Sequence, residues 1–516
     1  MVIVGLGGLT TDPACAVLVD GKIAAAVEQN KLGSAHTAEA IQTALRLAGA
    51  TAADVDTVAL ARPFSERAGG HRVQVSMRYL CPNARIVSVE HHHAHAASAY
   101  YASPFDQATV LTLDRSGDFR CGARWQAKGS QLTLSHEISY PDSLGDLYSG
   151  VTELLGFHAN ADEHKVQWLS TSGSPVYTAM FRSMLPGMRL DRTWFDSGRV
   201  GGGGFSAKLY DTLGLEDGAA IPAEMKPAIA ASLQQAVEEM VAELAGDGEN
   251  LCLAGGLALN GLLVASLERS GKWKKVFVQP AAGNSGTAIG AAYYAWHTVH
   301  GRDERHPMET VALGPEFSPE EIKRVLENCK LGFRYMLTTD ELLGAAVDQL
   351  ASDKIVAWMQ GRMEFGSRAL GNRSILASPL NSYSTENLNV YIKHREPFRK
   401  FAASVPAELA SEYFEVGENA RYLATVGRAR EAHRKTFESA VLGDGLVRVH
   451  TVDAAENPLF HKLLLAWGKK TGLPVLYNTS FNLFGAPLVC NPRDAVRSFY
   501  SSGIDAMIAG HFLLEK

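Results

Sequence analysis

The sequence predicts an α/β protein of two domains, and three observations lead to that prediction. Segments with strand-like and helix-like hydrophobic patterns alternate along the chain, as in layered α/β folds. The 516 residues, 46% apolar and 20% charged, are enough for two to four separately cored domains. Segment 314–319 is rich in glycine and proline and is typical of a domain end followed by a helix N-cap. We therefore predict a first domain over residues 1–335 and a second over residues 345–516.

Composition and charge narrow the class of protein. The net charge of −6, from 49 basic and 55 acidic side chains, gives no global reason to bind nucleic acid or an acidic membrane. The six cysteines form no C-x-x-C pair, which argues against a zinc ribbon and against a dense disulfide framework. The N-terminus lacks a basic leader, and the longest apolar run, residues 254–267, is too short to span a bilayer. We therefore expect a cytoplasmic protein without a membrane segment.

The first domain is expected to open with strands joined by tight turns. Residues 2–6 and 15–28 are strand-like, and Asp20-Gly21 is a hairpin signal. A helix is predicted over 40–48, a strand over 56–61, a helix after Glu90 and a strand over 108–113. Apolar residues at helical spacing from Ile229 to Leu244 predict a long helix before a strand at 250–254.

The second domain is predicted to contain fewer elements. Residues 355–359 are strand-like and lead into a segment rich in glycine and arginine, 361–374. Another strand is predicted over 473–477, a helix over 492–501 and a last strand near 506–509. We find no strict internal repeat in the sequence.

A metal site is suggested by the run His91-His92-His93-Ala94-His95. On a helix His91 and His95 project from one face, and Asp114 at a strand end is a natural third ligand. His92 and His93 are expected beside the metal ligands, facing substrate, or exposed. For an isolated H-x-x-x-H pattern, a hydrogen-bonded helix start is the more common explanation.

An anion site is suggested by Arg362, Arg368 and Arg373 within segment 361–374, because glycines let an anion approach the backbone while guanidinium groups bind its oxygens. A second basic cluster spans residues 393–400 and includes Lys393, Arg395 and Arg399. A solvated helix face explains this second cluster equally well.

Three further segments have the composition of a ligand site. The polar residues Asn478, Ser480 and Asn482 alternate after a buried-looking strand and suit the oxygens of a phosphate or a similar ligand. The turns Gly255-Gly256 to Asn260 and Gly283-Asn284 onward each follow a strand and open a helix, where backbone N–H groups can meet a phosphate or ribose. An Asx-type turn explains the first segment as an alternative, and ordinary strand-to-helix turns explain the other two.

Taken together, segments 90–99, 360–376, 396–399 and 474–482 resemble the carbamoyltransferases of antibiotic and nodulation-factor biosynthesis. The resemblance covers nearly the whole chain. It implies a two-lobed, actin-like, ribonuclease-H-like first domain related to tRNA threonylcarbamoyl transferase. It also implies a smaller α/β second domain with a twisted sheet, related to threonylcarbamoyl-AMP synthase.

The resemblance also implies a reaction. The second domain makes carbamoyl-adenylate from ATP, with Mg²⁺, and carbamoyl phosphate, and the first domain transfers the carbamoyl group to a hydroxyl of a small-molecule acceptor. The implied metal, for which the family favours iron, is bound by His91, His95, Asp114 and the residue at Asn284. Asp12, Arg368, Lys393 and Arg399 are the implied catalytic residues. Substrate and nucleotide binding is implied for Glu163, Lys165, Gly255, Gly256, Asn260, Gly283, Arg373, Arg395, Arg448, Asn478, Ser480 and Asn482.

Three departures from the family pattern fall in the first domain. Asn284 stands where the family has an aspartate ligand, and Thr11 stands where it has a histidine beside Asp12. The family's charged run is shortened to residues 28–31, and His164 replaces a glycine. Two alternatives therefore stay open: a carbamoyl-adenylate synthase or binding protein with a degenerate transfer domain, and an actin-like kinase or ATPase. A tRNA substrate would lack a basic surface, and the acceptor and the oligomeric state, including a homo-oligomer, are left open.

Overall fold

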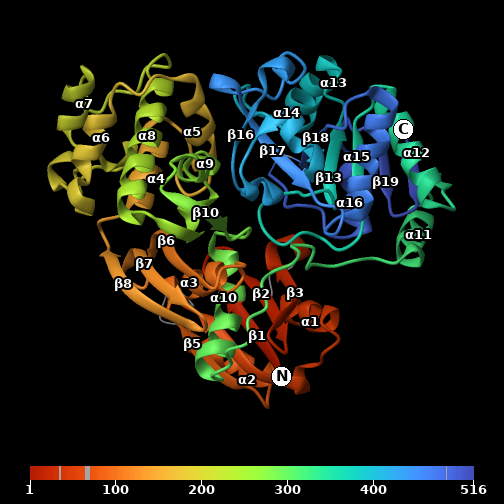
Figure 1. The fold of residues 1–516 in the computed structure, drawn as a ribbon, viewed down its shortest axis with the longest axis horizontal. Coiled ribbons are helices and arrows are strands. Elements are labelled where there is room, and N and C mark those ends of the chain that lie inside the picture. The colour runs from red at the N-terminus through yellow and green to blue at the C-terminus, as the bar shows by residue number, and fades with distance from the viewer. Residues whose placement is uncertain (34–36, 64–69, 484) are drawn as a thin grey trace.

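The computed structural model of the protein describes residues 1–33, 37–63, 70–483 and 485–516. Its chain forms three β-sheets, each covered by helices (Figure 1). The first lobe lies at the bottom of the view, the second at the upper left, and the C-terminal domain at the upper right. The α/β class predicted from the alternating pattern is confirmed.

The first sheet has five strands in the order β3-β2-β1-β4-β5. The strands are β1 (Val2–Gly7), β2 (Ala14–Val19), β3 (Lys22–Glu28), β4 (Val55–Ala61) and β5 (Arg85–Val89). The predicted hairpin at Asp20-Gly21 is present, because β2 and β3 pair in antiparallel register across it. Helix α1 (Thr37–Leu47) packs on β2 and β3, and α2 (Gly70–Leu80) contacts β5.

The second sheet repeats the topology of the first. Its order is β10-β9-β6-β7-β8, and the strands are β6 (Gln107–Gly117), β7 (Arg120–Lys128), β8 (Gln131–Ser139), β9 (Gly248–Ala254) and β10 (Trp273–Val278). In each sheet the first strand is central, pairs antiparallel with the second strand and parallel with the fourth. The repeat absent from the sequence is therefore present in the connectivity, and the two-lobed ribonuclease-H-like fold is confirmed.

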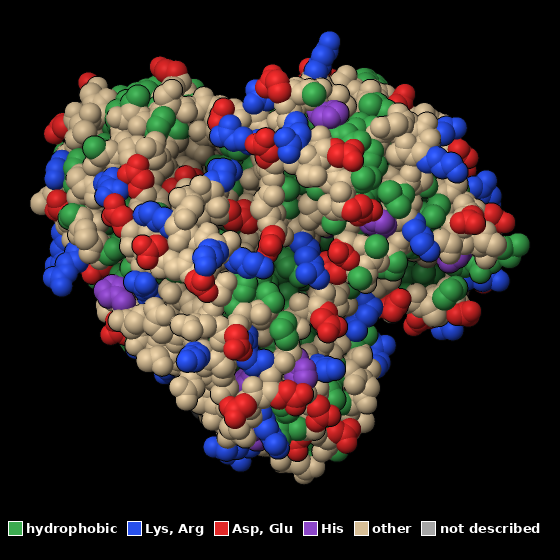
Figure 2. Space-filling model, in the orientation of Figure 1, with side chains coloured by type: hydrophobic (Ala, Val, Ile, Leu, Met, Phe, Trp, Pro, Cys, Tyr) green, Lys and Arg blue, Asp and Glu red, His purple; other side chains and the backbone are tan. Residues whose placement is uncertain are grey.

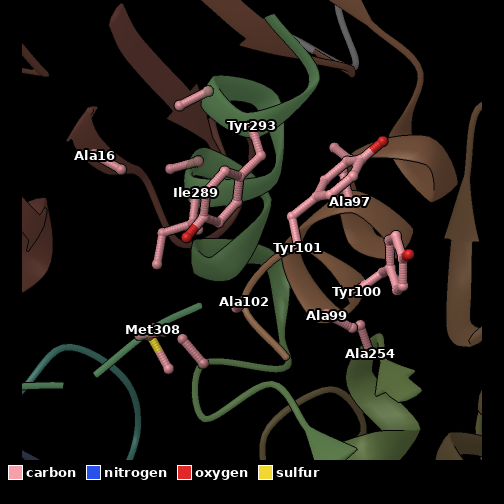
Figure 3. Packing of buried hydrophobic residues seen from close by; sticks show 14 of the residues in the cluster. Ala16, Ala97, Ala99, Tyr100, Tyr101, Ala102, Ala254, Ile289, Tyr293 and Met308 are labelled. Carbon is pink, nitrogen blue, oxygen red and sulfur yellow. The ribbon is translucent and has the colours of Figure 1, made fainter. Parts of the chain in front are cut away.

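Two helices lie between these sheets and join the lobes. Helix α3 (His91–Tyr100) packs on β6 and β9, and α10 (Thr287–Tyr294) packs on β1, β2 and β4. The helices contact each other closely, and a Cβ on Gly290 of α10 would overlap the carbonyl oxygen of Ala94 in α3. Tyr100, Tyr101 and Tyr293 pack in this shared core among small alanines (Figure 3). The packing fixes α3, and with it the predicted histidines, against the end of β6.

Helices cover the outer face of the second sheet and form a second core. They are α4 (Leu144–Leu154), α5 (Glu163–Leu169), α6 (Thr178–Met184), α7 (Ala207–Leu213), α8 (Lys226–Ala245) and α9 (Gly261–Arg269). Helix α8 contains the predicted apolar stripe, and Ile229, Leu233, Val237 and Val241 are fully buried.

The C-terminal domain is built on one mixed sheet of ten strands. In spatial order these are β11 (Arg334–Tyr335), β20 (Phe512–Glu515), β19 (Ala506–Ala509), β12 (Val356–Met359), β13 (Arg373–Ala377), β18 (Leu476–Ser480), β14 (Ala402–Pro406), β17 (Leu446–Val452), β16 (Gly427–Ala429) and β15 (Phe414–Glu415). Its helices are α11 (Pro319–Asn328), α12 (Thr339–Ala351), α13 (Ser382–Asn387), α14 (Ala410–Tyr413), α15 (Pro458–Thr471) and α16 (Pro492–Tyr500).

Alternation along β12 separates two cores in this domain. Val356 and Trp358 pack in a cluster with residues of α12 and α15, whereas Ala357 and Met359 pack in a cluster with residues of α11 and α16. Successive side chains of a strand point to opposite faces of its sheet. The sheet is therefore covered on both faces, which explains why its neighbouring strands β12 and β19 are apolar without interruption.

Three boundaries differ from the prediction. Helix α11 packs against α16, and β11 pairs with β20, so residues from Pro319 onward belong with the second domain although the first was expected to reach residue 335. The strand expected over 473–477 is β18, which begins later, because Pro474 has no N–H for the ladder. The last strand is β20 rather than β19. In the part of the chain that the structure describes, no helix is long and apolar enough to cross a membrane.

Candidate active site

Helix α3 and strand β6 bring two histidines and one carboxylate together. The Glu90 side chain caps α3 by accepting from the backbone N–H groups of His92 and His93, which starts the helix where the sequence predicts it. His91 and His95 then lie one turn apart. Asp114 Oδ2 lies 3.0 Å from His91 Nε2 and 3.1 Å from His95 Nε2. One ligand atom from each residue lies within 4.8 Å of the others, as a shared metal ion requires.

Hydrogen bonding constrains the ring of His91. Its Nδ1 lies 3.1 Å from the carbonyl oxygen of Arg62, which only accepts hydrogen bonds. Nδ1 therefore carries the proton, and in the neutral ring Nε2 presents a lone pair to the Asp114 carboxylate. Two facing acceptors need a proton or a cation between them, so the donor set fits a divalent metal. Burial opposes ionisation of Asp114, but its contacts with His91 and His95 outweigh this and hold the pKa of Asp114 well below its usual range.

Asn284 lies at the start of the turn that leads into α10. Its Nδ2 donates to Thr11 Oγ1 at 2.9 Å, and its buried Oδ1 has no hydrogen-bond partner among the described residues. An orphaned amide oxygen on a residue that lines the same cavity as His91 and Asp114 fits a neutral fourth ligand. The contact with Thr11 also ties together the two positions that depart from the family pattern.

The rings of His92 and His93 contact residues of the protein core rather than the metal-ligand triad. Burial lowers the pKa of His92 to about 3, and its Nδ1 lies 2.9 Å from Thr112 Oγ1. Burial also lowers the pKa of His93 to about 4, and its ring packs between Trp125 and Tyr294. Both rings are held neutral, and the triad of ligand atoms includes neither.

A cavity of about 920 Å³ adjoins the histidine triad. His91, Asp114, Asp12 and Asn284 line it, and Arg368 of the C-terminal domain also lines it. The pKa of Asp12 is raised by desolvation and by the nearby Glu28 carboxylate. The cavity therefore combines candidate metal ligands, a carboxylate that binds protons more readily than usual, and a cation.

A smaller cavity of about 270 Å³ lies against the C-terminal domain. Ser480, Asn482 and Gly283 line it. Five residues line both cavities, namely Asp12, Leu259, Asn284, Ser367 and Arg368. The two cavities therefore share a wall at the junction of the two domains.

Cationic side chains gather at the same junction. The pKa of Arg448 is held well below its usual range by burial and by repulsion from Arg368, Arg395 and Arg399. Burial, and then Arg399, lowers the pKa of Arg395 to about 9. One carboxylate, Glu396, lies 3.4 Å from Arg399. Such mutual repulsion is relieved by a bound anion.

Residues of the second lobe complete the arginine cluster from the other side. Helix α5 places the Trp168 ring 5.3 Å from the Arg448 guanidinium, and Lys165 pairs with Glu396 at 2.9 Å and with Asp162 at 3.2 Å. Burial, followed by repulsion from Arg399, lowers the pKa of His164 to about 4. Lys165 was expected to bind substrate, and the structure instead gives it two carboxylate partners.

Lys393 lies almost fully buried beside the smaller cavity. Its Nζ donates to the carbonyl oxygens of Ser480 and Asn482 and to the Asn482 side chain, at 2.6–2.9 Å. Burial, followed by repulsion from Arg395, holds the pKa of Lys393 well below its usual range. Asn478 donates to Ala369 O, while its buried Oδ1 lacks a partner among the described residues. These predicted residues therefore lie together.

Other residues predicted to bind ligands hydrogen-bond to or pack against the protein itself. Arg362 and Arg373 donate to backbone carbonyls rather than facing a cavity. Asn260 caps α9, and Glu163 accepts from Ser149 and Asn160, although both also line the larger cavity. Gly256 lines that cavity as well, whereas the Gly255 backbone packs on Leu113, where a Cβ would overlap the carbonyl.

The sequence prediction missed residues at the mouth and at the domain junction. Phe119, 90% exposed, and Tyr140, 51% exposed, line the larger cavity. Phe119 lies in the β6–β7 turn at φ 66°, and a bulky side chain at a turn tip was the only available signal. Glu28 and Lys31 bind the loop that carries Arg368. On the face shown in Figure 2, basic and acidic side chains are interspersed.

Comparisons with known proteins agree across both domains. The family models described as "Carbamoyltransferase N-terminus" and "Carbamoyltransferase C-terminus" match residues 80–293 and 347–516. An uncharacterized protein of Synechocystis is 38% identical over 83% of this chain and 76% of its own length. Nodulation protein NolO of Bradyrhizobium diazoefficiens is 34% identical over 83% of this chain and 79% of its own. The 3'-hydroxymethylcephem-O-carbamoyltransferase of Amycolatopsis lactamdurans is 35% identical over 54% of this chain and 52% of its own.

Proposed function

This chain belongs to the carbamoyltransferase family, and we propose that it is an ATP-dependent O-carbamoyltransferase acting on a hydroxyl of a small natural product or sugar. The donor is carbamoyl phosphate, and the activated intermediate is carbamoyl-adenylate. The name of the cephem relative, which specifies an O-carbamoyltransferase, supports a hydroxyl acceptor.

One observation carries the proposal. Arg368 lines both cavities, and it belongs to a cluster with Arg395, Arg399 and Arg448 in which the charges repel one another. A nucleotide or a carbamoyl phosphate supplies the missing negative charge. Guanidinium groups bind phosphate oxygens in a fork and stabilise charge that develops on them. A kinase of actin-like fold would leave this cluster of the C-terminal domain without a role.

Activation of the carbamoyl group takes two steps, hydrolysis of carbamoyl phosphate and adenylation of the resulting carbamate. Water attacks the phosphorus of carbamoyl phosphate, the bond from that phosphorus to the carbamate oxygen breaks, and inorganic phosphate leaves. The freed carbamate oxygen then attacks the α-phosphorus of Mg²⁺-bound ATP. The bond from that phosphorus to the bridging oxygen breaks, and pyrophosphate leaves. Arg368, Arg395, Arg399 and Arg448 neutralise the phosphates. Lys393 holds the Ser480–Asn482 segment in place through its carbonyl contacts.

Transfer takes place in the larger cavity. The acceptor hydroxyl oxygen attacks the carbamoyl carbon, its proton passes to the Asp12 carboxylate, and the bond from that carbon to the AMP oxygen breaks. The raised pKa of Asp12 suits it to accept a proton. A divalent metal held by His91, His95, Asp114 and Asn284 would polarise the carbamoyl oxygen when bound. Family resemblance favours iron for this site.

Pyrophosphate release tests the proposal. Purified protein with ATP, Mg²⁺ and carbamoyl phosphate should release pyrophosphate, and omission of carbamoyl phosphate should stop the release. Arg368→Ala should abolish it, whereas Arg324→Ala, which removes an exposed arginine on α11, should not. Pyrophosphate release that is independent of carbamoyl phosphate would refute the adenylation step. Mass spectrometry with a panel of hydroxylated metabolites would then identify the acceptor.

A further inference from the structure

The loop that carries Arg368 is held by an ion pair from the first lobe. The backbone N–H of Gly366 donates to Glu28 Oε2 at 3.0 Å, and Lys31 Nζ donates to the carbonyl oxygen of Gly366 at 2.5 Å. Glu28 and Lys31 also pair with each other. Glu28 ends β3 and Lys31 follows in the next turn. Both backbone polar groups of one glycine are therefore bound by one ion pair across the domain junction.

The pair lies in a poorly solvated place. The side chains of Glu28 and Lys31 are each 10% exposed. A buried ion pair adds little stability, because desolvation of the two charges offsets their attraction unless further hydrogen bonds complete the site. Here Gly366 supplies those hydrogen bonds. The contact therefore stabilises this conformation of the loop, and the loss of one partner would leave the other charge buried and unpaired.

Position 366 requires glycine. Its φ is +112°, a backbone region that only glycine adopts easily, and a Cβ there would lie 3.2 Å from the carbonyl oxygen of Pro280. The next two residues, Ser367 and Arg368, line both cavities. Arg368 Nη2 donates to the carbonyl oxygen of Leu259 at 3.1 Å. The loop is thus fixed at Gly366 against the first lobe and at Arg368 against the second lobe.

We infer that Glu28 and Lys31 are positioning residues, which orient the peptide at Gly366 so that Arg368 faces both cavities at the domain junction. The inference rests on the proposed function, because Arg368 must act on phosphates for its position to matter. Positioning of a charged group contributes to turnover, since a displacement of about 1 Å can cost on the order of 100-fold in rate.

A rival explanation is that Lys31 binds a phosphate directly, because it lines the smaller cavity. The two explanations differ in what Glu28 does. Direct binding predicts that the loss of Glu28 leaves Lys31 free to hold the anion. Positioning predicts that Glu28 and Lys31 act as one unit, so that losing either is equivalent to losing both.

The test compares Glu28→Gln, Lys31→Met and the double variant in pyrophosphate release, a step that does not use Asp12, whose pKa is raised by desolvation and by the Glu28 carboxylate. Each single variant should lower kcat by about 10- to 100-fold, with KM for ATP and carbamoyl phosphate within about threefold of wild type. The double variant should lie within about threefold of the worse single variant. The double variant also leaves no buried unpaired charge, so it still tests the inference if a single variant folds poorly. Glu249→Gln and Lys274→Met break an exposed ion pair and should change neither constant.

Hydrogen exchange of the peptide that contains residues 366–368 provides a readout independent of activity. Exchange should be faster in all three variants than in wild type. The inference is overturned if Lys31→Met alone is impaired, if the losses multiply in the double variant, or if exchange is unchanged. Wild-type protein without pyrophosphate release would instead refute the proposed function, while the exchange result would still judge the contact.

Discussion

His91 Nε2 lies 3.0 Å from Asp114 Oδ2 while Nδ1 of the same ring faces a backbone carbonyl. A neutral imidazole and a carboxylate supply no proton for that contact. Although burial opposes it, the contacts with Asp114 raise the pKa of His91, so the contact favours a cation at this point, a proton or a metal ion. A metal ion bridging the two explains the arrangement without ionising a ring that is almost completely buried, 4% exposed. This relationship leads to the first prediction.

Asp114→Asn should abolish metal binding and slow carbamoyl transfer by at least about 100-fold, because it removes the only negative charge of the ligand set. Pyrophosphate release should stay within about threefold of wild type, since the arginine cluster is untouched. Elemental analysis of the purified protein measures the metal. His95→Ala should behave in the same way, and His136→Ala, an exposed histidine on β8, is the control. Equal metal content in Asp114→Asn and wild type would rule out this site.

Phe119 gives a second prediction, about the acceptor. An exposed phenylalanine at φ 66° lowers the stability of the fold in two ways, through backbone strain and through exposed apolar surface. We expect its ring to stack on the acceptor at the cavity mouth. Phe119→Ala should raise the acceptor KM by about 3- to 10-fold, with KM for ATP unchanged.

Two further variants separate the ring of Phe119 from its backbone. Phe119→Trp keeps an aromatic surface and should bind acceptor like wild type. Phe119→Gly should lose acceptor affinity but keep or increase stability in thermal denaturation, because glycine adopts positive φ without strain. An acceptor KM that stays constant across all three variants would place the acceptor elsewhere.

The sequence predicted local features better than tertiary ones. The start of α3 was predictable because Glu90 caps it and the histidines follow at once. The repeated sheet topology was not, because pairing order is fixed by contacts between distant segments that share no sequence repeat. The arginines of segment 361–374 show the same limit. Residue type gave an anion site, yet Arg368 faces the cavities while Arg362 and Arg373 bind carbonyls.

Arg373 is accordingly predicted to stabilise the fold rather than to bind phosphate. Its guanidinium, fully buried, donates to carbonyl oxygens of Gln360, Gly361 and Pro315 at 2.7–3.1 Å. Arg373→Met leaves these carbonyls without a donor and should lower the free energy of unfolding by about 3 kcal/mol or more in urea titrations. Arg373→Lys should be milder. A stable Arg373→Met protein with a raised KM for ATP would contradict this prediction and indicate that Arg373 binds the nucleotide.

The last prediction concerns acid stability and His450. Its ring is buried, lies 3.0 Å from Ser404 Oγ through Nδ1 and stacks on Phe460. Burial lowers the pKa of His450 to about 3, whereas an unfolded histidine has a pKa of about 6.5. On acidification the unfolded chain therefore takes up the proton first. The contribution of this residue to stability is constant above about pH 6.5 and falls by about 1.4 kcal/mol per pH unit below it, until about pH 3.

His450→Gln keeps a polar group for Ser404 but cannot be protonated in this range. Urea unfolding at pH 7, 6 and 5 should show a shallower loss of stability with falling pH than in wild type, even if the variant is less stable at pH 7. His136→Gln, which changes an exposed ring, should keep the wild-type slope. Because other buried histidines such as His92 titrate in the same direction, the relevant quantity is the difference in slope between His450→Gln and wild type. Identical slopes would mean that His450 is solvated well enough to be protonated in the folded state.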